Sequence, residues 1–332
     1  MRILVTGGSG FIGINFISKM LSKGHLVHNL DNLSLFRKDF NKKSQKYTFN
    51  KIDIRNKNSL NEIINEFKPD KVVHLAAETH VDKSISAPDN FVTTNVLGTY
   101  NLLQASLNFF KSPYVTKNFC FHHISTDEVY GSLKKNETSF NEDSKYKPNS
   151  PYSASKASSD HLVRAWQKTY NLPCVITSCT NNYGPYQHPE KFIPVVILSG
   201  IMKKSIPIYG KGNNIRDWIY VDDHVDALVT IIEKNIINKN YLIGSQNEKQ
   251  NIEIVNLICD ALDHLYDNNY SHDRLKTFVK DRLAHDYRYS VNSNLVQNDT
   301  TWRPKNSFSE GIQKTIRWYL QNEDWWRGLV KL

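Results

Sequence analysis

Three consecutive polar side chains, Thr126, Asp127 and Glu128, follow a short apolar run and carry groups suited to acid–base chemistry. The run from Phe119 to Ile124 is typical of a buried parallel strand, so these side chains fall at its carboxyl end, where open α/β sheets bind ligands. Neighbouring carboxylates in a dry pocket can have pKa values far enough apart to leave one acid and one base. The stretch predicts a catalytic strand end; the alternative is a strand-end turn with a helix cap.

Tyr152 and Lys156 form a second candidate pair. Four residues separate them, and a helix is expected from Tyr152 to about Tyr170, so phenol and ammonium share one helix face. This spacing is common on helices and is weak evidence alone. It becomes informative when a cofactor site accompanies it.

A glycine-rich stretch near the start of the chain predicts such a site. A strand from Ile3 to Thr6 leads into Gly7-Gly8-Ser9-Gly10-Phe11-Ile12-Gly13, a helix follows to about Leu21, and a second strand ends at Asp31. Small residues let backbone N–H groups and the helix N-terminus approach a pyrophosphate. An acidic residue at this point accepts hydrogen bonds from ribose hydroxyls and repels a 2′-phosphate. Asp31 therefore favours NAD over NADP.

Further strands and helices alternate along the first part of the chain. The expected elements are strands at 47–52, 71–75 and 174–178, a long helix at 88–109, then a strand at 215–221 and helices at 225–233, 251–266 and 308–326. This order predicts a Rossmann-type doubly wound parallel sheet with a smaller α/β C-terminal substrate domain. We expect residues 1–180 to form the NAD-binding domain, segments such as 215–245 to return to it, and residues 181–332 to form mainly the substrate-binding domain.

Composition excludes several classes of protein. The chain has 332 residues, 39% apolar and 23% charged, which suits a globular protein. Its net charge of +9 comes from scattered Lys and Arg, so we expect no nucleic-acid partner. No apolar run is long enough for a membrane helix or a signal peptide, so we expect a cytoplasmic protein without a membrane partner. The four cysteines lack metal-ligand spacing, so reduced thiols and no metal are expected.

Together these stretches resemble the nucleotide-sugar 4,6-dehydratases of the extended short-chain dehydrogenase/reductase superfamily, most closely those that act on dTDP-glucose. Asp127 and Glu128 discriminate most, because related epimerases and decarboxylases usually lack adjacent carboxylates here. The similarity covers nearly the whole chain and rests on the glycine loop, Leu75–Ile85, Ser125–Gly131, Pro151–Lys156, Asn181–Pro194, Arg216–His224 and Asp281–Tyr289.

The resemblance implies a lyase that removes water from the sugar and regenerates its NAD. Tyr152 would take the proton of the 4-hydroxyl while hydride leaves C4, with Lys156 lowering the pKa of the phenol and Thr126 bonding the same oxygen. Glu128 would take the C5 proton, and a protonated Asp127 would release the C6 hydroxyl as water. The product is a 4-keto-6-deoxy sugar, a step in deoxysugar biosynthesis.

The resemblance also implies binding residues and a homodimer. The helices around residues 90–108 and 153–170 would pair with those of a second subunit as a four-helix bundle. NAD would contact Gly7, Gly10, Phe11, Ile12, Gly13, Asp31, Asn32, Asp53, Ile54, Leu75, Ala76, Ala77, Thr94, Tyr152, Lys156 and Asn181. The nucleotide sugar would contact Ser84, Thr126, Asn181, Glu190, Lys191, Arg216, Asn251, Arg282, His285 and Tyr289.

Some assignments have alternatives from the residues themselves. Arg216, expected on the diphosphate, could instead form a surface ion pair, and Asp53 could be a cap or turn residue. The chain departs from the family pattern at Leu35-Phe36-Arg37-Lys38, near the adenosine, and at Leu283-Ala284 and Tyr287, near the nucleotide. A UDP-glucose 4,6-dehydratase, an epimerase or decarboxylase, and a catalytically silent NAD-binding protein remain the competing functions.

Overall fold

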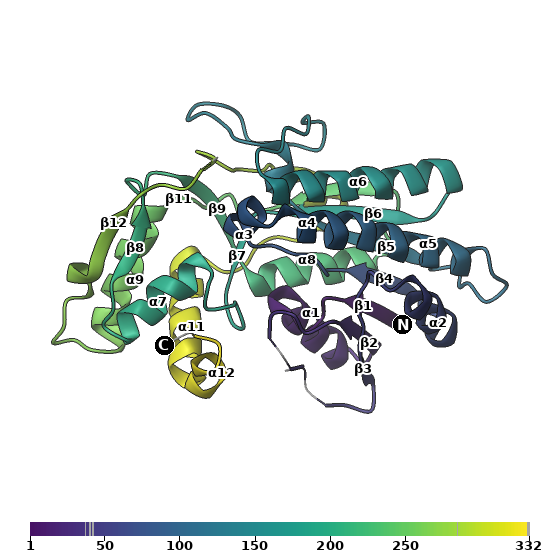
Figure 1. Ribbon diagram of the computed structural model, residues 1–332, viewed down its shortest axis with the longest axis horizontal. Helices are drawn as coiled ribbons and strands as arrows, with labels where there is room; N and C mark the ends of the chain where they lie inside the picture. The colour runs from purple at the N-terminus through teal and green to yellow at the C-terminus, as the bar shows by residue number, and fades with distance from the viewer. Residues whose placement is uncertain (37, 40, 42, 284, 331–332) are drawn as a thin grey trace.

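A parallel sheet of seven strands forms the centre of the molecule (Figure 1). The computed structural model describes residues 1–36, 38–39, 41, 43–283 and 285–330. All neighbouring strands are parallel, and the chain order reverses beside β1, as in doubly wound folds. The Rossmann-type sheet expected from the sequence is confirmed. Its spatial order is β3 (Tyr47–Lys51), β2 (Leu26–Asp31), β1 (Arg2–Thr6), β4 (Lys71–His74), β5 (Cys120–Thr126), β6 (Cys174–Cys179) and β10 (Lys239–Ile243).

Helices cover both faces of this sheet. One face packs against α2 (Lys57–Phe67), α5 (Thr99–Phe110) and α6 (Pro151–Tyr170), and the other packs against α1 (Phe11–Ser22), α8 (Val221–Glu233) and α10 (Asn294–Thr300). Because neither face meets water, the central strands β5 and β6 are buried along their whole length.

The long helix expected at residues 88–109 is interrupted. It consists of α4 (Pro88–Phe91), a π-helical turn (Val92–Gly98) and α5, with the short α3 (Val81–Ser86) before it. Within the turn, the Asn95 amide donates to the Ser155 hydroxyl at 2.8 Å and to the Glu78 carbonyl oxygen at 3.0 Å. The irregular turn therefore ties the segment after β4 to α6, close to the sheet edge where ligands are expected.

The second part of the chain builds a separate lobe beside the sheet edge (Figure 1). Its apolar core joins α7, α9 and α11 through side chains such as Ile197, Ile258 and Ile316. The lobe comprises β7 (Asn181–Tyr183), β8 (Ile206–Tyr209), β9 (Ile215–Tyr220), β11 (Glu248–Gln250), β12 (Lys276–Val279), α7 (Phe192–Ile201), α9 (Asn251–Leu265), α11 (Phe308–Gln321) and α12 (Glu323–Arg327).

Two expected boundaries were wrong. The helix expected at 225–233 begins at Val221, with Asp222 and Asp223 in its first turn, and the Asp223 carboxylate accepts the N–H groups of Lys305 and Asn306. The tail helix expected at 308–326 is two helices, because the chain turns at Asn322. In the segment 215–245, α8 packs on the large sheet and β10 pairs with β6 within it. By contrast, β9 pairs with β7 and β11 in the second lobe.

Candidate active site

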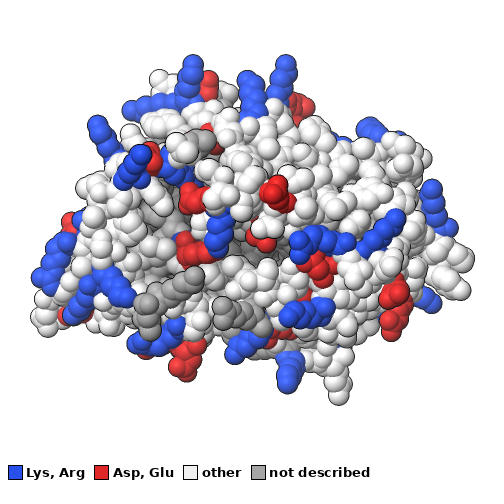
Figure 2. Space-filling model, in the orientation of Figure 1, with Lys and Arg blue, Asp and Glu red and all other residues white. Residues whose placement is uncertain are grey.

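A cavity of about 330 Å³ opens at the carboxyl ends of the central strands. Its walls come from the segments that follow β1 to β6, from the start of α6 and from the 187–191 loop of the second lobe. This is the switch point of a doubly wound sheet, where such folds bind nucleotides. Figure 2 shows charged side chains of both signs around the central hollow, while Lys and Arg elsewhere on this face are spread out.

The glycine loop after β1 forms one wall of the cavity. Gly7 has φ +72°, and a Cβ there would lie 2.5 Å from the Ala76 backbone nitrogen. A Cβ on Gly13 would lie 2.5 Å from the Gly7 carbonyl oxygen. Only glycine lets β1, the loop and α1 approach so closely. The N-terminus of α1 then faces the cavity at Gly10 and Phe11, as a pyrophosphate site requires.

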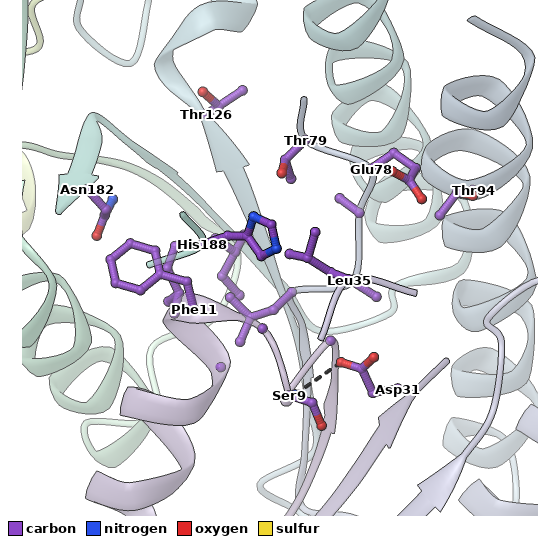
Figure 3. A pocket seen from close by; sticks show the side chains of 18 of the residues that line it. Ser9, Phe11, Asp31, Leu35, Glu78, Thr79, Thr94, Thr126, Asn182 and His188 are labelled. Atoms are coloured by element: carbon purple, nitrogen blue, oxygen red, sulfur yellow. Dashed lines mark hydrogen bonds between the residues drawn. The ribbon is translucent and has the colours of Figure 1, made fainter. Parts of the chain in front are cut away.

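Asp31 stands at the end of β2 beside this loop (Figure 3). Its carboxylate accepts the Ser9 N–H at 3.0 Å and the Leu33 N–H at 2.8 Å. Burial raises the pKa of Asp31, and these two hydrogen bonds lower it again. The side chain is therefore held at the cavity wall, in the position that suits ribose hydroxyls.

The stretch that follows β5 brings two carboxylates into the cavity wall. Asp127 is 2% exposed, and it starts a 3₁₀ turn (Asp127–Tyr130) whose cap is the Thr126 hydroxyl, 3.3 Å from the Glu128 nitrogen. Burial raises the pKa of Asp127 well above its usual range, and Glu128 raises it further. Burial also raises the pKa of Glu128, against the charges of Arg282 and Arg216. The capped turn that the sequence offered as the alternative is present, and it also places the carboxyl groups of Asp127 and Glu128 in the wall of the cavity.

Tyr152 and Lys156 line the same cavity from α6. The Lys156 ammonium donates to the Ile124 carbonyl oxygen at 2.8 Å, which holds α6 against β5. Burial raises the pKa of Tyr152 well above its usual range, and the Glu128 charge adds to this. In this structure the pKa of the phenol is therefore set mainly by burial and by the neighbouring carboxylate.

Four polar atoms in the cavity wall are buried and have no hydrogen-bond partner within the described part of the chain. They are Asp127 Oδ2, Thr180 Oγ1, Asn181 Oδ1 and Gln187 Oε1. Buried polar groups are rarely left unpaired in folded proteins. Their position indicates that a polar ligand completes them.

Most of the residues expected to bind NAD lie together in this cavity. Asp53 is the exception: it pairs with Arg55 at 2.7 Å and accepts the Asn32 amide at 3.0 Å, outside the lining residues. Those that line the cavity are Gly7, Gly10, Phe11, Ile12, Gly13, Asp31, Asn32, Ile54, Leu75, Ala76, Ala77, Thr94, Tyr152, Lys156 and Asn181.

The residues expected to bind the sugar are more dispersed. Thr126, Asn181 and Lys191 line the cavity. Arg216 and Arg282 lie beyond it, but both charges act on Glu128. Arg216 is 5% exposed and donates to the carbonyl oxygens of Ile215, Tyr287 and Asp286, so the alternative of a surface ion pair does not apply.

The remaining five have other partners in this structure. The Ser84 hydroxyl donates to the Val81 carbonyl oxygen, and Glu190 pairs with Lys83 at 2.8 Å. Asn251 begins α9, and His285 lies 2.6 Å from Asp281. The Tyr289 ring lies under Arg216, 4.2 Å from its guanidinium carbon. None of these five is among the described residues that line the cavity.

Several lining residues escaped the sequence-based prediction. Ser9, Glu78, Thr79, Asn182 and His188 all line the cavity (Figure 3). Each lies within a few residues of a predicted one, so the strand-end positions alone would have indicated them. Phe36, in the departing segment after β2, also lines the cavity; Arg37 and Ala284 of the two departing segments lie outside the described residues. Among the described residues no group of three or more His, Cys, Asp or Glu could hold a metal.

The dinucleotide-type cavity and the Tyr–Lys pair on α6 place the protein in the short-chain dehydrogenase/reductase class. The family model described as GDP-mannose 4,6 dehydratase matches residues 4–315. The dTDP-glucose 4,6-dehydratase of Shigella flexneri is 46% identical over 340 residues, which cover 98% of this chain and 94% of that protein. The chain belongs to the dTDP-glucose 4,6-dehydratase family.

Solved structures agree with this assignment. The dTDP-glucose 4,6-dehydratase of Streptomyces venezuelae, solved with NAD and dTDP bound, superposes with a TM-score of 0.89 at 36% identity and covers 99% of this chain and 100% of that one. A UDP-glucose 4-epimerase of Thermotoga maritima has a TM-score of 0.86 at 26% identity, covering 97% of this chain and 100% of that one. The fold is thus shared with epimerases. No helix within the described residues is long and apolar enough to span a lipid bilayer.

Proposed function

We propose that this protein dehydrates dTDP-glucose to the 4-keto-6-deoxy sugar with NAD as its cofactor. The observation that carries the proposal is the pair of adjacent carboxyl groups of the buried Asp127 and the half-buried Glu128, in the same cavity as Tyr152 and Lys156. An epimerase needs redox chemistry at one sugar carbon, whereas loss of water also needs an acid and a base. The pair supplies both.

The residues present fit NAD. The glycine loop packs so closely that a Cβ on Gly7 or Gly13 would lie 2.5 Å from backbone atoms, which keeps the N-terminus of α1 at the cavity wall, and Asp31 is held by backbone N–H groups at the end of β2. Its negative charge favours a ribose with free hydroxyls over one with a 2′-phosphate. The glycine loop, the N-terminus of α1 and Asp31 would hold NAD, which would supply the acceptance and return of hydride in this reaction.

We assign the proton transfers to the cavity residues. Tyr152 takes the proton of the 4-hydroxyl, with Thr126 bonding the same oxygen. Because burial raises the pKa of the Tyr152 phenol, the positive charge of Lys156 is needed to keep Tyr152 as the phenolate that accepts this proton.

Elimination follows from the C4 ketone, which acidifies the C5 proton. Glu128 takes that proton, and Asp127, protonated because burial raises its pKa well above the usual range, gives its proton to the departing C6 hydroxyl. Glu128 then returns its proton to C5, and the site is restored when Tyr152 loses the proton that it took and Asp127 regains one. The overall change is the loss of one water, and the cofactor ends in its starting oxidation state.

We also propose that the protein acts as a homodimer through α6 and the helical segment 88–110. Val92 is 55% exposed and Leu97 48% exposed on that segment, while Ala154 and Ala165 are exposed on the adjacent α6. Exposed apolar and small side chains on two adjoining helices suit close packing against the same pair in a second copy.

The function is tested by incubating the purified protein with dTDP-glucose. We expect a product lighter by one water, with the alkaline absorbance of a 4-keto sugar. UDP-, GDP- and CDP-glucose serve as the comparison panel, and we expect the dTDP sugar to have the highest kcat/KM. Formation of an epimer with no loss of water would refute the proposal.

A further inference from the structure

Asp160 has a carboxylate in the protein interior that none of the proposed proton transfers uses. It lies on α6, one helical turn after Lys156, and is 0% exposed. A buried ionised carboxylate is costly unless it is paired and hydrogen-bonded. Its partners therefore indicate why it is there.

Two hydroxyl groups donate to this carboxylate. The Ser125 hydroxyl lies 2.9 Å and the Tyr146 hydroxyl 2.7 Å from Asp160 Oδ2. Ser125 immediately precedes Thr126, so the first of these bonds joins the carboxyl end of β5 to α6 beside the cavity. The bond from Lys156 to the Ile124 carbonyl oxygen is a second link between α6 and the end of β5. The two links hold the strand end that precedes Asp127 and Glu128, the proposed acid and base.

Two cationic groups could compensate the charge of Asp160. His123 Nε2 lies 3.0 Å from Asp160 Oδ1, but burial lowers the pKa of His123 to about 4, so its ring is neutral at neutral pH. Lys156 is 5% exposed; burial lowers the pKa of its ammonium and the charge of Asp160 raises it. The Lys156 ammonium, buried one helical turn before Asp160, is therefore the cation placed to balance its charge.

We propose that Asp160 is a positioning residue of the active site: its carboxylate is the buried counter-charge that keeps the Lys156 ammonium protonated, and its bond to Ser125 holds the end of β5 against α6. This inference rests on the proposed function only for the role of Lys156 in the reaction. The other groups near the pair are His74 on β4, His123 on β5, Cys179 on β6, Tyr146 before α6 and Arg164 on α6.

The first test is the pH dependence of kcat for Asp160→Asn, measured on the NAD-loaded protein. The amide can still accept bonds from Ser125 and Tyr146 but carries no charge. We expect the alkaline limb of the profile to move to lower pH by at least about one unit, because an opposite charge nearby shifts a pKa by one to three units. Tyr146→Phe is the matched control: it removes one donor to Asp160 and leaves the charge, so its alkaline limb should stay in place.

A second test needs no catalysis and applies even if Asp160→Asn does not fold. In Lys156→Gln the Asp160 charge loses its partner, so the pKa of Asp160 rises in the folded state. Stability relative to the wild type should then decrease as pH rises from about 4 to 7, and the melting temperature should report it. An unmoved alkaline limb in folded Asp160→Asn, or a Lys156→Gln melting difference that is constant with pH, would overturn the inference. A wild type that does not dehydrate dTDP-glucose refutes the proposed function instead.

Discussion

Phe36 packs against Trp325 with ring centroids 5.6 Å apart, so the loop after β2 contacts the last helix of the chain. Phe36 also packs on His188 at 5.3 Å, and both residues line the cavity. Trp325 in turn packs on Tyr186 at 5.8 Å. The C-terminal helices thereby hold two loops, distant in sequence, that together form the wall on the side expected to take the adenosine.

Replacing Trp325 should therefore weaken cofactor retention. Aromatic pairs contribute about 0.5–1.5 kcal/mol each, and Trp325→Ala removes the contacts with Phe36 and Tyr186. We expect NAD to dissociate roughly tenfold faster, which corresponds to about 1.4 kcal/mol, with kcat preserved at saturating NAD. Stopped-flow measurement of NAD release tests this. Tyr270→Ala, which removes a partly buried ring elsewhere in the same lobe, should leave the release rate unchanged; equal acceleration in both variants would contradict the prediction.

Glu128→Gln should abolish dehydration while NAD stays bound. The amide fits the same space but cannot take the C5 proton, and loss of a general base typically costs about 10²–10⁴-fold in rate. Turnover of dTDP-glucose and exchange of the C5 proton with deuterated solvent should both fall by this factor. Asp127→Asn is the informative partner, because it should slow loss of water and spare the exchange at C5. Undiminished exchange in Glu128→Gln would remove this residue from the role of base.

Buried histidines should make the protein sensitive to mild acid. Burial lowers the pKa of His122 to about 3 and of His224 to about 3. The unfolded chain takes up protons on these rings below about pH 6.5 while the folded chain does not, so stability falls as pH drops from about 6.5 towards 4. Buried carboxyl groups with raised pKa values, such as Asp127, act in the opposite sense, so a variant comparison is the cleaner test.

His122→Gln is that variant, since a glutamine can keep a hydrogen bond to Thr177, which lies 3.0 Å from the His122 ring. We expect the slope of unfolding free energy against pH between 4 and 6 to become shallower by up to about 1.4 kcal/mol per pH unit, the value for one proton. Urea unfolding at a series of pH values measures it. His264→Gln, at an exposed position on α9, should leave the slope unchanged. A slope that His122→Gln leaves unchanged would mean that His122 is protonated in the folded state.

A charge on the exposed helical face should dissociate the proposed dimer. Leu97→Glu places a carboxylate where two copies would pack, and an unpaired charge in an apolar interface costs several kcal/mol. Sedimentation should give the mass of a dimer for the wild type and of a monomer for the variant. Leu257→Glu is the matched control, since Leu257 is 38% exposed on α9 in the other lobe. A wild-type monomer would refute the interface, as would a Leu97→Glu variant that stays dimeric.

Local patterns in the sequence predicted most of the fold. Strand, glycine loop, helix and second strand predicted the core of the sheet, because glycine spacing and apolar periodicity depend on neighbouring residues alone. The errors fell where distant residues decide the outcome. At the start of α8 the Asp223 carboxylate binds the tail, and the π-helical turn at residues 92–98 lies where Asn95 ties α6 to the segment after β4.

The sequence by itself determined the residue types at the strand ends: the acid pair, the Tyr–Lys pair, the glycine loop and Asp31. Tertiary structure alone decided their electrostatics. Burial raises the pKa values of Asp127 and Tyr152, and this depends on side chains that pack over them from remote parts of the chain. The tertiary structure also brings the Ser125 and Tyr146 hydroxyls to Asp160, one helical turn from Lys156. It packs Trp325 against Phe36. The Ser125–Asp160 and Phe36–Trp325 contacts join residues far apart along the chain, so no local pattern in the sequence records them.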